Sequence, residues 1–308
     1  MISLNKNINI HTVDEYAFRN ACFNGHLDIV KYLISLDDNI DIHVQNEAGF
    51  RDACYFRHLK LVKYLISLDK NIIIHAENEY AFAVACQNGH LKLAKYLISL
   101  DENINIHADN ECAFNLACRF GHLEVVKYLI SLNQNINIHA EDENAFIFAC
   151  QNGHLEIVKY LINLNQNINI HIDNENAFRF ACYRGHLEIV KYLINLNENI
   201  NIHACCDYVI RYACYNNHKQ VAEYLCSLTN RYSIKCENNK LTYVIIDYLD
   251  KSKENYDNIP KHNICKQDMC CLCLEETPLQ VLFCFCDHML CLMCYTEVLN
   301  HVCYVENI

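Results

Sequence analysis

Tryptophan is absent from the chain, and proline and glycine are scarce, with two and six residues among 308. Scarce glycine and proline argue against turn-rich β architectures and against disordered segments of low complexity. No apolar run approaches the ~18 residues that a membrane-spanning helix needs. The N-terminal residues MISLNKNINIH contain no apolar core of signal-peptide length. These absences predict a soluble, intracellular protein with no membrane partner.

Basic residues are also few, because 25 Lys and Arg stand against 37 Asp and Glu, giving a net charge of −12. A protein that binds nucleic acid regardless of its sequence needs clustered Lys and Arg to neutralise phosphates. The composition therefore predicts no nucleic-acid partner. The apolar share of 52% is ordinary for a folded chain.

Histidine reveals an internal repeat of 32 residues, because 14 of the 17 histidines fall into two columns with that spacing. The first column holds His11, His43, His75, His107, His139, His171 and His203. The second holds His26, His58, His90, His122, His154, His186 and His218. Seven of the 21 cysteines form a third column, Cys22, Cys54, Cys86, Cys118, Cys150, Cys182 and Cys214. About seven tandem units result.

Each unit reads as a pair of short helices. In the third unit, the first helix is expected over residues 80–87 and the second over residues 91–100, with Gly89 between them. Leu93, Ala94, Leu97 and Leu100 give the second helix an apolar stripe. The segment DENINIH then leads to the next unit, and its Asp or Asn stands where a left-handed helix stop is expected. Residues 239–249 fall in phase with the first helix of an eighth unit, which predicts a helical end cap.

The segment GHLEIVKYLI, at Gly185–Ile194, resembles the ankyrin repeat, and it recurs in most units of residues 1–250. The resemblance implies an all-α, ankyrin-type helical solenoid that binds a protein partner on its concave face. The Thr-Pro-Leu-His opening of the family is missing, and each unit is one residue shorter than ~33. The Asn-, Ile- and Tyr-rich style resembles the ankyrin proteins of giant amoebal DNA viruses. That implies the cytoplasm or nucleus of a host cell.

The repeat columns also have a chemical interpretation, which is less favoured. Equivalent histidines in adjacent units lie about 8–10 Å apart, too far for two imidazoles to share one zinc ion. We therefore expect each His to cap or bridge backbone groups. Disulfides within the Cys column meet the same objection, so these thiols are expected to be small buried residues.

Some positions vary freely between units while the core columns barely change. They are one column of the first helix and the two residues before each Gly-His step. Arg, Tyr and Phe supply much interface energy, so these residues are the candidate partner-binding surface. The alternative is solvent exposure with sequence drift. The candidates are Arg19, Arg51, Tyr55, Arg119, Arg179, Tyr183 and Arg211.

The pattern changes after a polar linker at residues 251–268. Cys270-x₂-Cys273 is followed by Cys286-x-His288-x₂-Cys291-x₂-Cys294. Two Cys-x₂-Cys pairs about 17 residues apart are typical of zinc sites, each pair on a knuckle turn supplying half of a tetrahedron. The sequence predicts a small zinc-binding module at residues 269–308.

This run resembles the first three quarters of a RING finger, a module that positions a ubiquitin-conjugating enzyme. The resemblance implies one zinc on Cys270, Cys273, Cys291 and Cys294, and a second site begun by Cys286 and His288. The final Cys-Pro-x-Cys is missing, which leaves Cys303 as a third ligand of that site. Either His301 or Glu306 is a weak fourth ligand, or the site is empty, and Cys271 and Cys284 are spare thiols that could substitute. Leu272 matches the apolar contact to the conjugating enzyme. The module could be a working RING, a zinc-stabilised docking fragment or a decayed remnant.

Two functions follow from these patterns. The first is a protein–protein interaction scaffold with a RING-like zinc module. The alternative is a RING-type ubiquitin ligase whose solenoid selects the substrate and whose module acts by positioning. An enzyme that uses the many His and Cys side chains directly is not expected, because nearly all of them belong to repeat columns or to the zinc cluster.

Overall fold

The computed structural model describes residues 9–245, apart from residue 38 and the pairs or single residues at 70–71, 102, 133–134, 165–166, 197–198, 230–231 and 238–239. It also describes the backbone of Met269–Cys273 and Leu282–Cys286. The linker predicted at 251–268 lies outside the described residues. The chain divides into two compact parts, each treated by itself below. The first is Met1–Ile172 with Asn176–Ala181, and the second is Asp173–Glu175 with Cys182–Ile308.

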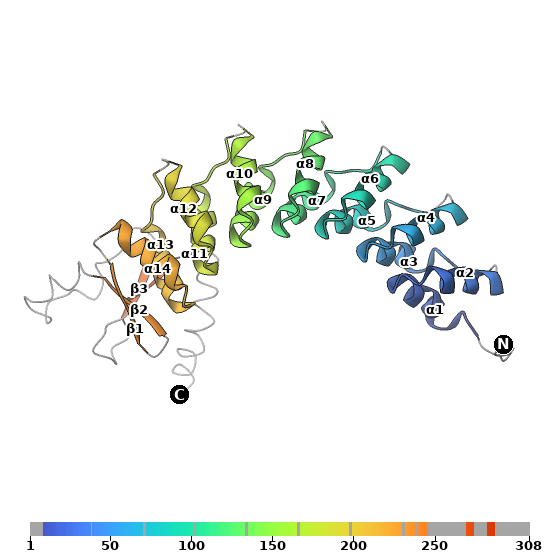
Figure 1. The fold of residues 1–308 in the computed structure, drawn as a ribbon, viewed down its shortest axis with the longest axis horizontal. Helices are drawn as coiled ribbons and strands as arrows, with labels where there is room; N and C mark the ends of the chain where they lie inside the picture. The colour runs from blue at the N-terminus through green and yellow to red at the C-terminus, as the bar shows by residue number, and fades with distance from the viewer. Residues whose placement is uncertain are drawn as a thin grey trace, which may run out of the picture. The chain divides into compact units, whose positions relative to one another are not determined.

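Fourteen helices, two per repeat, make up the described residues between 12 and 228 (Figure 1). The first helices of the repeats are α1 (Thr12–Phe23), α3 (Val44–Tyr55), α5 (Ala76–Gln87), α7 (Ala108–Arg119), α9 (Ala140–Gln151), α11 (Ile172–Arg184) and α13 (Ala204–Tyr215). The second helices are α2 (Leu27–Leu36), α4 (Leu59–Leu68), α6 (Leu91–Leu100), α8 (Leu123–Ser131), α10 (Leu155–Asn163), α12 (Leu187–Asn195) and α14 (Lys219–Leu228). The predicted second helix of the third repeat is confirmed at both ends.

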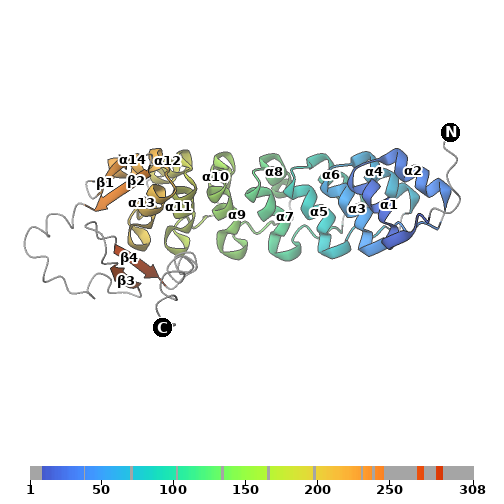
Figure 2. The same ribbon diagram turned by 90° about the horizontal axis from the view of Figure 1, so that it is seen from below.

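In the first part, each odd-numbered helix packs against the next, from α1 to α9, and each even-numbered helix covers its own partner (Figures 1 and 2). Figure 1 shows the odd-numbered helices on the inner side of the curve that this part describes. The core is a column of fully buried phenylalanines, one per repeat, flanked by the Cys column and by Val and Leu of the even helices. The phenylalanines are Phe18, Phe50, Phe82, Phe114, Phe146 and Phe178.

Each buried phenylalanine contributes about 1.5–3 kcal/mol to folding, and its contacts lie within its own repeat and the neighbouring ones. A single helix pair cannot enclose such a side chain. The repeated Phe, Cys and Leu columns therefore require a stack, which is the physical reason for a solenoid.

A left-handed turn of three residues opens each odd-numbered helix from α1 to α11. In α5, Glu77, Asn78 and Glu79 have φ values of 54°, 54° and 65°, and the regular helix begins at Tyr80, where the sequence predicts it. The middle residue of this turn is always Asn or Asp, the residues other than glycine that most readily adopt left-handed backbone. These middle residues are Asp14, Asn46, Asn78, Asn110, Asp142 and Asn174.

The predicted left-handed stop after the second helix is confirmed in the fourth and fifth repeats, where Asn135 and Asn167 have φ values of 54° and 55°. It is wrong for the third repeat. Asp101 is extended, with φ −145° and ψ 115°, and it uses its carboxylate to accept the backbone N–H of Asn103 at 2.8 Å. The left-handed residues of this repeat lie instead at Glu77–Glu79 and at Gly89.

The predicted all-helical solenoid is confirmed from α1 to α14, but the helical cap predicted at residues 239–249 is wrong, because a β-hairpin follows the last repeat. In the second part, β1 (Tyr232–Glu237) pairs antiparallel with β2 (Lys240–Ile245), with Ile234 opposite Tyr243. Thr242, Tyr243, Val244 and Ile245 are β-branched or aromatic, which favours a strand over a helix. The hairpin packs on α13 and α14 and buries Leu241.

Candidate functional site

The first histidine column joins each repeat to the next. His43 Nδ1 donates to Glu47 Oε1 at 2.7 Å, and the same oxygen accepts the backbone N–H of Ile73 from the following repeat at 3.1 Å. His43 Nε2 faces Asp69 Oδ2 at 3.3 Å. Only a protonated imidazole donates from both nitrogens, and the hydrogen bond to Glu47 favours that form because it raises the pKa of His43.

The buried acidic residue of this bridge is the third residue of the left-handed turn. It is 1–6% exposed in every repeat where it is a glutamate. Its hydrogen bonds hold the turn closed and offset the roughly 1–2 kcal/mol per residue that left-handed backbone costs. The column is Glu15, Glu47, Glu79, Glu111, Glu143, Glu175 and Asp207.

The second histidine column makes a different bridge, from a ring nitrogen back to the preceding repeat. His58 Nε2 donates to the carbonyl of Phe23 at 3.1 Å, and His154 Nε2 donates to that of Arg119 at 2.9 Å. The accepting carbonyls belong to the last residue of an odd-numbered helix. The second column therefore bridges backbone groups as the sequence predicts, whereas the rings of the first column bond to side-chain carboxylates.

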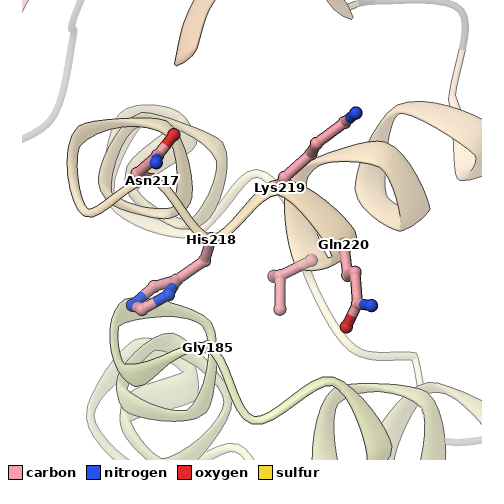
Figure 3. A pocket seen from close by; sticks show the side chains of 6 residues that line it. Gly185, Asn217, His218, Lys219 and Gln220 are labelled. Atoms are coloured by element: carbon pink, nitrogen blue, oxygen red, sulfur yellow. The ribbon is translucent and has the colours of Figure 1, made fainter. Parts of the chain in front are cut away.

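The same bridge occurs in the second part, where His218 Nε2 donates to the carbonyl of Tyr183 at 2.8 Å. Its ring lies over Gly185 in a shallow pocket that Asn217, Lys219 and Gln220 also line (Figure 3). A Cβ at Gly185 would stand 2.5 Å from His218 Nδ1. At Gly185, both the left-handed backbone and the ring packed on it favour glycine. The same column holds Arg57 and Asn217 in two other repeats, with φ values of 64° and 60°.

These columns offer little chemistry beyond structure. Among the residues that the structure describes, no group of three or more His, Cys, Asp and Glu side chains could hold a metal ion. The thiols of the Cys column are buried, and burial raises the pKa of Cys22 to about 12. A thiol with such a pKa stays protonated at neutral pH and is a poor nucleophile.

The predicted partner-binding residues divide into two sets. Those in the first-helix column cap the left-handed turn: Arg19 Nε donates to the carbonyl of Asp14 at 2.7 Å, and Arg51 Nη2 to that of Gln45 at 3.0 Å. Arg179, at the same position, is only 4% exposed. The structure gives this column an internal role that the sequence did not predict. Arg211, at the same position of the last repeat, is half-buried and interacts with at least one neighbouring group.

The other set lies at the ends of the odd-numbered helices. We define the tip row as the last residue and the C-cap of each odd-numbered helix from α1 to α9. None of its members is buried, and its aromatic members Phe23, Phe56 and Phe120 are 46%, 39% and 46% exposed. The row consists of Phe23, Asn24, Tyr55, Phe56, Gln87, Asn88, Arg119, Phe120, Gln151 and Asn152.

The tip row combines a fixed backbone with variable side chains. The carbonyls of Phe23, Tyr55 and Arg119 each accept a ring N–H from the second histidine column. Their side chains point outward and differ from repeat to repeat. Such a surface loses little backbone entropy when a partner binds. Tyr183 occupies the same position in the second part, and its ring lies 5.6 Å from that of Tyr212.

Opposite pKa shifts of two histidines, one from each column, predict a stability optimum. The hydrogen bond to Glu47 raises the pKa of His43 above 6.5, whereas burial lowers the pKa of His122 below 6.5. Stability from His43 is complete below the unfolded pKa and is lost as pH rises through the folded value. Stability from His122 is complete above the unfolded pKa and is lost as pH falls towards the folded value. The thermal midpoint should therefore peak near pH 6.5.

Single variants separate the two limbs of this profile. We expect His43→Gln to flatten the fall in thermal midpoint on the alkaline side, and His122→Gln to flatten it on the acid side. The measurement is the thermal midpoint by circular dichroism from pH 5 to pH 9. Unchanged limbs in both variants would show that the two columns do not carry the pH dependence.

The structure describes only two short segments of the predicted zinc module at residues 269–308. Cys270, Cys273 and Leu272 lie on β3 (Met269–Cys273), and Cys286 lies at the end of β4 (Leu282–Cys286). The two strands pair antiparallel, with Met269 opposite Cys286. This backbone is a strand at both members of the first Cys-x₂-Cys pair, where the sequence predicts a knuckle turn. The remaining predicted ligands lie outside the described residues: His288, Cys291, Cys294 and Cys303.

A family model described as ankyrin repeats (3 copies) matches residues 50–142 and 132–204, together half of the chain. The chain belongs to the ankyrin-repeat family. The crystal structure of the human ASB11 ankyrin repeat domain is similar over 69% of this chain and 97% of that chain, with a TM-score of 0.52 and 17% identity. That likeness shows the fold alone.

No curated protein matches the sequence. The resemblance to proteins of giant amoebal DNA viruses stays a prediction, as do the RING-like module and its zinc. Within the residues that the structure describes, no helix has the length and apolar character to span a bilayer.

Proposed function

We propose that this chain is a protein–protein interaction scaffold and that its tip row is the partner-binding surface. Ankyrin repeats generally act by binding proteins, and that much follows from the family. The observation that carries the finer proposal is the histidine-fixed backbone under exposed aromatic and Arg side chains. Aromatic and Arg side chains in a preorganised setting are the usual source of interface energy.

Exposed apolar residues on α2 give a rival surface. Ile29, Tyr32 and Leu36 are 48%, 47% and 47% exposed, and their spacing places them on one side of the helix. Further along the first part, the equivalent tyrosines of the even-numbered helices contact a lysine of the preceding repeat. Lys63 Nζ lies 4.9 Å from the ring centroid of Tyr96, and Lys95 Nζ lies 5.1 Å from that of Tyr128, one repeat onward in each case.

A comparison of two variants tests the proposal. The tip variant carries Phe23→Ser, Phe56→Ser and Phe120→Ser, and the matched outer variant carries Ile29→Ser, Tyr32→Ser and Leu36→Ser. The full-length chain and both variants are used as bait in quantitative affinity capture from candidate host cells. We expect a set of proteins that the wild type and the outer variant retain and that the tip variant loses. Loss from the outer variant alone would place the site on α2.

We further propose that residues 269–308 bind zinc through Cys270, Cys273, Cys286, His288, Cys291, Cys294 and Cys303. The support is the donor set itself, thiols with one imidazole, which is the chemistry that structural zinc prefers. The first four-ligand site is complete by spacing, and the second lacks a clear fourth ligand. We expect about one zinc per chain, lost on Cys270→Ser but kept on Cys226→Ser, a cysteine of α14.

Metal analysis of the purified full chain by mass spectrometry measures this stoichiometry. No zinc in the wild type would contradict the module. The ubiquitin-ligase alternative depends on the same residues together with Leu272. Two zincs per chain, with autoubiquitination that Leu272→Ala abolishes, would favour the ligase over the scaffold.

A further inference from the structure

The second position of the tip row alternates between two kinds of side chain. Asparagine occupies it in every other repeat, and its amide turns inward to donate to a helix-end carbonyl. The side-chain Nδ2 of Asn24 donates to the carbonyl oxygen of Asn20 at 2.8 Å, that of Asn88 to Tyr55 at 3.2 Å, and that of Asn152 to Phe148 at 2.9 Å. In the repeats between them, the position is Phe56 or Phe120, which project outward. The first part therefore presents an aromatic cap at every second repeat.

Each of these aromatic caps is the centre of a small cluster. Phe56 lies against Phe23 and Tyr55, with ring centroids at 4.3 and 4.8 Å. Phe120 lies beside Arg119, whose guanidinium carbon is 5.8 Å from the Phe120 centroid and 5.1 Å from that of Phe148. Between the clusters stands a repeat whose tip residues are Gln87 and Asn88. The tip row therefore contains two apolar clusters, and one repeat with polar tip residues separates them.

The spacing of the clusters suits an extended polypeptide. Adjacent repeats pack at about 8–10 Å, so two repeat steps separate Phe56 from Phe120 by roughly 16–20 Å. An extended chain rises about 3.3 Å per residue, so five or six residues cover this span. Six is an even number, and side chains at i and i+6 of an extended segment lie on the same face. One peptide can therefore reach both clusters without turning.

The charge of the row is opposite to that of the chain. None of its ten residues is acidic, although the chain has 37 Asp and Glu against 25 Lys and Arg. Arg119 belongs to the row, and exposed Arg57 follows Phe56 directly, with a left-handed φ of 64°. The acidic side chains of the same helices lie at the opposite end, in the left-handed turns, as at Asp109, with one exception, the half-buried Asp52 near the end of α3. The tip row is thus a positive and aromatic edge.

We infer that the tip row binds an extended acidic segment of a partner protein, with two aromatic or large aliphatic side chains six residues apart. One anchor contacts the Phe23–Tyr55–Phe56 cluster and the other contacts Phe120 and Phe148. Carboxylates of the segment face Arg57 and Arg119. This inference rests on the proposed function, because it names the chemistry of the partner at the same surface.

A random library of displayed 16-residue linear peptides, selected against the full chain, tests the inference. We expect the enriched pool to be acidic and to contain paired apolar residues at i and i+6. A labelled peptide from that pool should lose at least tenfold in affinity on Phe56→Ser and on Phe120→Ser, and a similar factor on Arg119→Glu. Tyr32→Ser should leave its affinity unchanged, and thermal midpoints verify that every variant is folded.

Other outcomes would overturn the inference. Enrichment at a helical spacing near i and i+11, or with no acidic preference, would reject the extended acidic segment. An unenriched library, combined with tip-dependent capture of proteins, would show that the partner presents a folded surface and would leave the proposed function standing. Failure of both experiments would reject the proposed function as well.

Discussion

Replacing Glu111 with alanine should lower the free energy of unfolding by about 3 kcal/mol, a large share of the stability of a domain. The carboxylate is 5% exposed, and its Oε1 accepts two bonds, from His107 Nδ1 at 2.7 Å and from the backbone N–H of Asn137 at 3.0 Å. Alanine would leave both donors without their acceptor at the interface between two repeats. Each such orphaned group costs about 1–3 kcal/mol.

Glu124→Ala is the matched control, since it removes the same type of side chain from the same repeat. Its carboxylate is 71% exposed and pairs with Lys127 at 2.9 Å on the surface of α8. Such a pair contributes between 0 and about 1 kcal/mol, so the control should be nearly neutral. Urea denaturation of both variants gives the comparison, and equal losses would refute the structural role of the His–Glu bridge.

The second large effect is expected at Gly121, where alanine should cost about 2–4 kcal/mol of unfolding free energy. Gly121 has φ +84°, and a Cβ there would stand 2.6 Å from His154 Nδ1. The imidazole must move, which breaks its 2.9 Å bond to the carbonyl of Arg119. The variant should therefore weaken the repeat stack and also release the backbone of the tip row.

Arg57→Gly is the reciprocal control, because Arg57 occupies the Gly column of its own repeat with φ 64°. Glycine there removes the strain of a side chain on left-handed backbone, which stabilises the folded state. Glycine also raises the conformational entropy of the unfolded chain, which offsets part of this stabilisation. We expect a change between zero and about 1 kcal/mol of stabilisation. Thermal and urea unfolding measure both variants, and a tolerated Gly121→Ala would contradict the close approach of the histidine ring.

Periodicity was sufficient to predict the solenoid. Columns of apolar residues 32 apart, with Gly89 between two helical stripes, predicted helices at residues 80–87 and 91–100, and the structure contains both. What periodicity missed is the left-handed turn before the first helix. The Asn/Asp column at its centre was available as a signal, but a propensity for left-handed backbone acts residue by residue. Its use three times in a row depends on the buried Glu bond, which is a tertiary contact.

The candidate site was also predicted only in part from the sequence. Variation between repeats selected both the tip residues, such as Tyr55 and Arg119, and the arginine column at Arg19 and Arg51. Sequence alone could not separate them, because a guanidinium that caps its own turn and one that faces a partner occupy equally variable positions. The hydrogen bond from Arg19 to the Asp14 carbonyl makes the distinction. The hairpin β1–β2 was missed because the repeat phase was extended past the last repeat, where β-branched residues replace the helix pattern.

The two histidine columns give this scaffold a consistent physical design. One column holds the turns at the start of the odd-numbered helices, and the other holds the carbonyls at their ends. The side chains between and beyond these anchors can change without altering the frame. That is the property a binding surface needs if its specificity is to vary while its stack remains intact.

The dissociation constant of a captured partner protein, measured by titration calorimetry against the wild type, the tip variant and the outer variant, tests the central claim most directly. The account predicts at least a hundredfold weaker binding for the tip variant, about 2.7 kcal/mol, and an unchanged constant for the outer variant. Equal affinities for the wild type and the tip variant, with both folded, would contradict the assignment of the tip row as the partner-binding surface.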